Sequence, residues 1–134
     1  MMGTLVDSCV LLDVMTEDKN WFDWSANMLE KCANQHELFI NPIIYSEISI
    51  GFKKIEELED VLPPSTFKRL PLPWEAAFLA GKAFFHYRQL GGQRTLPLPD
   101  FFIGAHAMVE NLQLLTRDPK RFKHYYPKIK IISP

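Results

Sequence analysis

The stretch that decides the fold is Gly3-Thr4-Leu5-Val6-Asp7-Ser8-Cys9-Val10-Leu11-Leu12-Asp13-Val14, near the N-terminus. Its first four residues carry no charge and are typical of a short buried strand. From Ser8 onward the apolar side chains recur at helical spacing, which predicts a short helix. Asp7 stands at the junction, so the chain is expected to turn from a strand into a helix at an acidic residue.

Strands and helices continue to alternate along the rest of the chain. Helices are predicted from Lys19 to about Asn34, from Pro42 to about Gly51 with Asn41 as the N-cap, from Lys53 to Leu62, from Pro73 to about Leu90 before Gly91-Gly92, and from Pro99 to Glu110. Strands are predicted at residues 37–40, 66–70 and 112–115, with a further one left open at 128–132, and residues 92–98 are expected to form a loop. Strands separated by helices need crossover connections, so the prediction is an α/β fold with a central, mostly parallel sheet of four to five strands flanked by helices.

The length of 134 residues fits a single domain, since domains average about 150 residues. Hydrophobic residues make up 47% of the chain and charged residues 23%, which supports a packed core and excludes a disordered or fibrous protein. We therefore expect one domain over residues 1–134.

Cysteine usage and charge spacing indicate the compartment. Cys9 and Cys32 belong to no CxxC or Cys/His cluster, so a disulfide framework or a structural zinc site is not expected. The longest uncharged stretches are about half the length of a membrane span, and no basic residue precedes Lys19. The expectation is a cytoplasmic protein with no membrane association.

Charge is distributed unevenly, although the net charge is only −1. The segment from Arg117 to the end holds six basic side chains and one acid, Asp118. Such a segment is either an electrostatic footprint for phosphate or a solvated tail, and the sequence leaves both open.

Four acids lie where a solvated acid is not expected. Asp7 and Asp118 follow predicted strands at their carboxyl ends, where ligands bind in open parallel sheets. Glu47 has Ile43, Ile44, Ile50 and Gly51 as helical neighbours, so it projects from an apolar stripe. Asp100 begins a helix face that continues through small, apolar residues. Singly, Asp100 could complement the helix dipole and Asp118 could form a turn before Pro119.

Together, these acids could converge on one crevice of the sheet. Clustered carboxylates raise one another's pKa values unless a cation compensates their charge. An all-oxygen cluster is what Mg²⁺ or Mn²⁺ prefers, so a divalent metal is the simplest partner.

Four short motifs carry a resemblance that runs nearly end to end. They are Leu5-Val6-Asp7-Ser8 followed by Val10-Leu11-Leu12-Asp13, then Asn41-Pro42-Ile43-Ile44-Tyr45-Ser46-Glu47, then Leu98-Pro99-Asp100-Phe101-Phe102-Ile103-Gly104-Ala105-His106-Ala107, and then Leu114-Leu115-Thr116-Arg117-Asp118. In this order and at these spacings the chain resembles the PIN-domain ribonucleases, and among them the VapC-type toxins of type II toxin–antitoxin pairs. One departure is the first motif, which is commonly Asp-Thr-Asn in the family and reads Asp7-Ser8-Cys9 here.

The resemblance implies a PIN-like three-layer fold and metal-dependent cleavage of RNA. The family's functional acids correspond to Asp7, Glu47, Asp100 and Asp118, with Asp7 and Asp100 expected as direct ligands of Mg²⁺ or Mn²⁺. Glu47 and Asp118 would complete the site, either as ligands through water or by orienting the attacking water. The resemblance also implies a protein antitoxin as partner and a homodimer.

Phosphate contacts with the RNA are expected from Arg94 and Arg117, although each is equally well read as a solvent-facing cation. Of the remaining candidates, His106 is expected to be structural or on the surface, Cys9 to be packed, and Asp13 to cap or pair.

Two other readings stay open. One is a catalytically silent PIN-like domain that binds RNA or protein. The other is a metal-dependent phosphatase or receiver-like domain, which is less favoured because it needs a second acid adjacent to a nucleophilic Asp, and Asp7 has none beside it.

Overall fold

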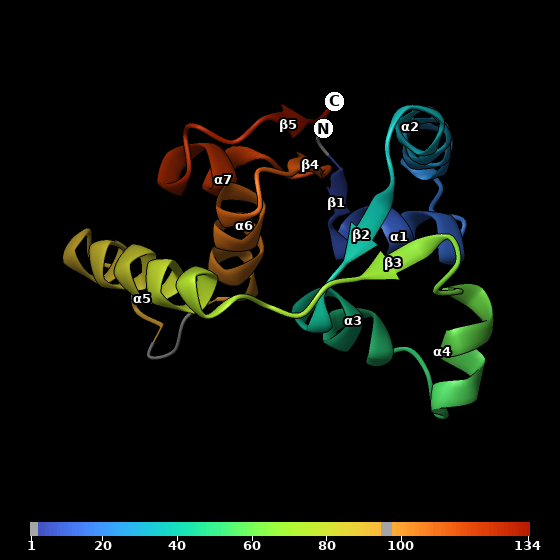
Figure 1. Ribbon diagram of the computed structural model, residues 1–134, viewed down its shortest axis with the longest axis horizontal. Helices are drawn as coiled ribbons and strands as arrows, with labels where there is room; N and C mark the ends of the chain where they lie inside the picture. The colour runs from blue at the N-terminus through green and yellow to red at the C-terminus, as the bar shows by residue number, and fades with distance from the viewer. Residues whose placement is uncertain (1–2, 95–97) are drawn as a thin grey trace.

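A computed structural model describes residues 3–94 and 98–134, and its centre is a five-stranded sheet in the order β3-β2-β1-β4-β5 (Figure 1). The strands are β1 (Thr4–Val6), β2 (Leu38–Ile40), β3 (Phe67–Arg69), β4 (Gln113–Leu115) and β5 (Ile131–Ile132). All four pairings are parallel, and β1 lies between β2 and β4. The predicted α/β class is confirmed, and so is the fifth strand that was left open.

Helices flank this sheet. In the described ranges they are α1 (Ser8–Met15), α2 (Phe22–Gln35), α3 (Pro42–Ser49), α4 (Ile55–Val61), α5 (Trp74–Gln89), α6 (Pro99–Val109) and α7 (Lys120–Tyr125). Figure 1 shows α5, α6 and α7 grouped on one side of the strands and α1, α2 and α4 on the other. None of the helices in these ranges has both the length and the apolar character needed to span a bilayer.

Apolar side chains from the middle strands form the centre of the larger core. Leu5 and Val6 of β1, Ile40 of β2, and Leu114 and Leu115 of β4 have no exposed surface. A smaller core lies between α5 and α6, where alanines at 76, 80 and 83 allow the two helices to pack closely. Because every strand of the centre is covered, polar groups can reach solvent only at the strand ends.

Some predicted helix boundaries were wrong. The second helix begins at Phe22 and not at Lys19, because the Asp18 carboxylate accepts hydrogen bonds from the backbone N–H groups of Asn20 and Trp21 and holds a turn there. Helix α3 ends at Ser49, and Ile50, which is 86% exposed, lies outside the expected apolar stripe. The predicted loop at 92–98 lies partly outside the described residues.

The basic segment after Arg117 is not a solvated tail. Residues 120–125 form α7, with the Phe122 side chain buried, and the Tyr126 hydroxyl donates a hydrogen bond of 2.7 Å to the Phe101 carbonyl. The sequence did not predict this helix because one buried residue in six positions leaves no apolar periodicity. Helix α7 places its cations beside the beginning of α6.

Close packing of α6 depends on Gly104. A methyl group there would collide with the buried ring of Tyr126. Gly104→Ala is therefore expected to lower the free energy of unfolding by about 1–3 kcal/mol, although alanine favours helices by about 1 kcal/mol over glycine.

Urea unfolding of the single and double variants checks whether the collision with the Tyr126 ring causes the loss of stability. In a Tyr126→Leu background the cost of Gly104→Ala should shrink, because the colliding ring is gone. An equal cost in both backgrounds would contradict the role assigned to the ring.

Candidate active site

Asp7 lies at the carboxyl end of β1, the middle strand. Its backbone N–H donates to the Leu115 carbonyl at 2.9 Å, which continues the pairing with β4. Its Oδ1 atom accepts a hydrogen bond from the Ser8 backbone N–H at 2.8 Å and caps α1, and its Oδ2 atom accepts one from the Thr116 hydroxyl at 2.8 Å. The carboxylate is thus fixed between two strands and a helix, with only 6% of the residue exposed.

Burial raises the pKa of Asp7 to about 6, and the carboxylates of Asp100 and Glu47 contribute to the rise. The hydrogen bonds from Thr116 and Ser8 favour the charged form of Asp7 and therefore limit the rise in its pKa. Two carboxylates from distant parts of the chain therefore lie within electrostatic range of Asp7. At neutral pH this site carries a negative charge that its surroundings disfavour.

Glu47 reaches the site from α3. This helix begins directly after β2, where the Asn41 side chain accepts a hydrogen bond from the Ile44 backbone N–H at 2.9 Å and Pro42 occupies the first turn. The half-buried Glu47 carboxylate accepts a hydrogen bond of 2.9 Å from the Ser8 hydroxyl. Burial raises the pKa of Glu47, and the Asp100 charge raises it further.

Asp100 and Asp118 complete the group from the other side. Burial raises the pKa of Asp100, Arg121 lowers it, and Asp118 raises it. The Arg121 guanidinium lies 3.4 Å from the Asp100 carboxylate. Asp118 is exposed, and its backbone N–H donates to the Thr116 hydroxyl at 3.1 Å.

The fold thus brings the predicted acids to one edge of the sheet, where Asp7, Glu47 and Asp100 influence one another and Asp118 acts on Asp100. The four acids do not form a complete set of metal ligands. Within residues 3–94 and 98–134, no three His, Cys, Asp or Glu side chains are grouped so that they could hold a metal ion. Mg²⁺ is usually held by one or two carboxylates, with water and substrate phosphate supplying the other ligands.

A comparison of two buried acids tests whether a cation fits at Asp7. Asp13 is 3% exposed and pairs with Arg117 at 3.0 Å, with a further hydrogen bond of 2.7 Å from the Ser25 hydroxyl. Asp7 is buried to a similar degree, yet the ion pairs found among the described residues do not include it. Because a buried carboxylate without a compensating cation is costly, the residues present suit a divalent ion.

The two arginines predicted to contact phosphate have different environments. The Arg117 guanidinium donates to Asp13 through Nε and Nη2 and lies 5.4 Å from the centre of the Trp21 ring. The prediction that Asp13 pairs is confirmed. The Arg94 side chain is exposed, and the Arg94 carbonyl accepts a hydrogen bond from Arg88.

Cys9 is partly buried and His106 is fully buried, which agrees with the packed role expected for Cys9 and with a structural role for His106. The Cys9 thiol donates to Asp7 Oδ2 at 3.5 Å, and burial raises its pKa to about 12, so it stays protonated. His106 is fully buried, its Nδ1 atom lies 2.9 Å from the Asn41 amide nitrogen, and burial lowers its pKa to about 4. A neutral His106 supports the Asn41 cap of α3.

Sequence reasoning did not assign roles to Thr116 or Arg121. Thr116 follows β4 directly, as Asp7 follows β1. This shared position at a strand end is the signal that could have indicated a role for Thr116 in the site. Arg121 gave no such signal, because only the fold of α7 brings it to Asp100.

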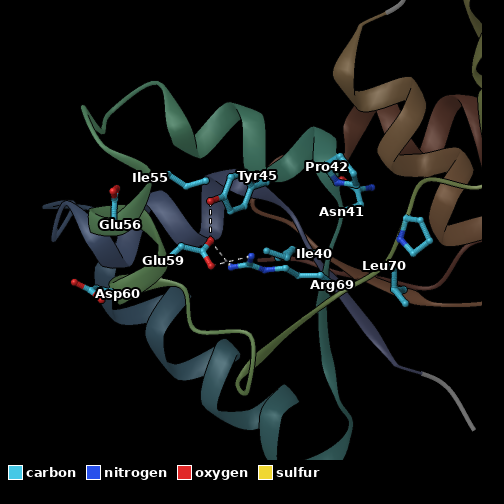
Figure 2. Close-up of a pocket in the computed structure, with 11 residues that line it drawn as sticks. Ile40, Asn41, Pro42, Tyr45, Ile55, Glu56, Glu59, Asp60, Arg69 and Leu70 are labelled. Atoms are coloured by element: carbon cyan, nitrogen blue, oxygen red, sulfur yellow. Dashed lines mark hydrogen bonds and ion pairs between the residues drawn. The ribbon is translucent and has the colours of Figure 1, made fainter.

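Two pockets of similar size lie in different parts of the molecule. One, here called the acid-side pocket, has a volume of about 710 Å³ and is lined by Tyr87, Asp100, Asp118, Lys120, Arg121, His124 and Tyr125. The other, of about 720 Å³, lies between α3, α4 and β3, where Glu59 bonds both Tyr45 and Arg69 (Figure 2). Its described lining contains none of the four acids, so the chemistry points to the acid-side pocket.

The fold and the acidic sheet edge define a parallel α/β domain built around clustered carboxylates. The family model of the PIN domain matches residues 4–127, and the chain belongs to the PIN-domain family. It is 25% identical to a protein named ribonuclease VapC of Rickettsia bellii (strain RML369-C), over 98% of this chain and 96% of the relative.

Solved structures share the fold. A VapBC2 structure from Rickettsia felis, bound to a promoter DNA fragment, superposes with a TM-score of 0.76 at 22% identity and covers 99% of both chains. A VapBC-1 structure from nontypeable Haemophilus influenzae gives a TM-score of 0.74 at 17% identity, covering 98% of each chain.

The raised pKa of Asp7 predicts a stability cost that a substitution should remove. Folding favours the neutral form of this acid, so wild-type stability without divalent ions should fall as the pH rises from about 4 through about 6. Asp7→Asn lacks this loss and should be about 1–3 kcal/mol more stable than wild type at about pH 8 in EDTA.

Urea unfolding at about pH 4 and about pH 8 measures the effect, and the advantage should disappear at the lower pH. Asp23→Asn, which changes an exposed acid of α2, is the matched control for the loss of one carboxylate. If Asp7→Asn were no more stable than wild type at the higher pH, the electrostatic account of this edge would be wrong.

Proposed function

We propose that this protein is the toxin of a toxin–antitoxin pair and acts as a Mg²⁺- or Mn²⁺-dependent endoribonuclease. The observation that carries the proposal is the buried Asp7 carboxylate, which has Glu47 and Asp100 within electrostatic range and no cation of its own among the ion pairs of the described residues. Membership of the PIN-domain family and the similarity to a protein named ribonuclease VapC support the nuclease activity.

In this mechanism Asp7 and Asp100 would hold the ion. Bound there, it would supply a lowered pKa for water and positive charge to offset that of the scissile phosphate. Glu47 and Asp118 orient the attacking water by accepting hydrogen bonds from it. Ser8 keeps Glu47 in position through its hydroxyl, and Thr116 does the same for Asp7.

The arginines are proposed to bind RNA phosphates on either side of the reacting bond. Arg94 is exposed and takes part in none of the ion pairs found among the described residues, whereas Arg117 pairs with Asp13. The effect on RNA affinity should therefore be larger for Arg94→Ala than for Arg117→Ala at equal salt concentration.

Asp100→Asn tests the catalytic assignment. Loss of the charged ligand should reduce Mg²⁺-dependent RNA cleavage by about 100-fold or more, with the fold retained, and EDTA should abolish cleavage by the wild type. The assay follows a labelled single-stranded RNA on a denaturing gel, and Asp23→Asn is the control for loss of one acid. Cleavage at the parent rate by Asp100→Asn, or in EDTA, would contradict the metal-dependent mechanism, whereas no cleavage by the wild type in Mg²⁺ or Mn²⁺ would favour a catalytically silent domain.

The partners follow from the same proposal. A protein antitoxin is expected to silence the enzyme, as several structural relatives are toxin–antitoxin complexes. The two cysteines are free thiols, which suits a cytoplasmic protein. A homodimer is also proposed, because the outer face of α5 exposes three aromatic side chains on one stripe: Trp74 (89%), Phe78 (64%) and Phe85 (61%).

Light scattering measures the dimer. The wild type should give about twice the chain mass of 15.6 kDa, and the double variant Trp74→Ser, Phe78→Ser should shift toward the single-chain mass, because the exposed apolar stripe is lost. A wild type that stays at the single-chain mass at micromolar concentration would rule the dimer out.

A further inference from the structure

The acid-side pocket contains more than the acids. Its lining adds three aromatic rings, from Tyr87, His124 and Tyr125, and two cations, from Lys120 and Arg121. Acids, cations and rings serve different parts of a ligand, so this composition suits a molecule that carries both a phosphate and a flat ring.

Phe101 holds the rings in place beside Asp100. This fully buried side chain packs edge to face with Tyr125, at 5.0 Å between ring centres, and with Tyr87, at 5.7 Å. Tyr125 in turn packs against His124 at 4.5 Å. Because Phe101 directly follows Asp100 in α6, the rings keep a constant position relative to the acid.

These rings are accessible. His124 is exposed, and Tyr87 and Tyr125 are partly exposed. The pocket of about 710 Å³ is within the range of about 300–1,000 Å³ typical of small-ligand sites. Rings that are braced from behind and open toward a pocket can stack on a planar ligand without first rearranging.

The cations are positioned for the phosphate of the same ligand. Arg121 lies 3.4 Å from the Asp100 carboxylate with 42% of its side chain exposed, and the exposed Lys120 precedes it in α7. A phosphate bound between the acids and these cations would continue into a nucleoside that faces the rings.

We infer that the acid-side pocket is a subsite that stacks one unpaired base of RNA next to the scissile phosphate, with Tyr125 and Tyr87 as the stacking residues. The inference rests on the proposed function and adds the residues that hold a base beside the reacting bond. A base in a duplex has both faces covered by its neighbours, so it cannot stack on these rings, whereas bases in loops can be splayed out.

Fluorescence anisotropy with a labelled ten-nucleotide oligouridylate tests the subsite, with Ca²⁺ in place of Mg²⁺. Tyr125→Leu and Tyr87→Leu should each weaken binding by about 10-fold, since they remove a ring of the size that a base stacks on. Tyr125→Phe keeps the ring and should recover most of the loss. Tyr45→Leu, in the pocket of Figure 2, is the matched control and should bind like the wild type.

Base removal identifies the contact. Wild type should lose affinity when one nucleotide of the oligomer is made abasic, and Tyr125→Leu should show no additional loss at that position. Thermal melting confirms that each variant is folded. The inference is overturned if folded Tyr125→Leu binds the intact oligomer as tightly as wild type, or if the tyrosine variants weaken antitoxin binding and leave RNA binding unchanged.

The two proposals fail separately. If the wild type does not cleave RNA in Mg²⁺ or Mn²⁺ but the tyrosine variants lose affinity for the oligomer, the subsite is supported and the nuclease proposal falls. If cleavage is sensitive to EDTA but the tyrosine variants cleave and bind like wild type, the nuclease proposal is supported and the subsite is wrong.

Discussion

A carboxylate buried at the end of the central strand is the constraint on which the rest of the site depends. Asp7 can be tolerated there only because hydrogen bonds reach it from the next helix and from the neighbouring strand, through Ser8 and Thr116. The same two residues extend the network, since the Ser8 hydroxyl bonds Glu47 and the Thr116 hydroxyl accepts from the Asp118 backbone. The position of one acid thus determines where two others lie.

The two buried acids of the first β–α unit differ in whether a basic side chain neutralises them. Asp13 is neutralised by Arg117 and contributes to the packing of α1 against α2, together with Ser25. The negative charge of Asp7, six positions earlier, is not neutralised. Its hydrogen bonds orient the carboxylate but bring no positive charge. An internal cation at Asp7 would stabilise the fold and at the same time occupy the place where an external ion can bind.

Much of the fold could be predicted because it follows from local patterns. Short strands alternate with helices, Asn41-Pro42 begins α3, and Gly91 adopts the left-handed conformation (φ +93°) that the end of α5 requires. Where prediction failed, a contact between distant or polar groups was decisive. The Asp18 carboxylate delays the beginning of α2, and α7 exists because Phe122 and Tyr126 pack against α6.

For the site, the sequence by itself determined which acids stand at strand ends and on helix faces, because strand and helix periodicity is written in neighbouring residues. It also determined the family, through motifs in a given order. Only the tertiary structure decided what surrounds those acids: Arg117 is held by Asp13, Arg121 lies beside Asp100, and rings from α5 and α7 gather at Phe101. These contacts join residues far apart in the chain, so no local pattern encodes them, and the packing of helices on the sheet brings them together.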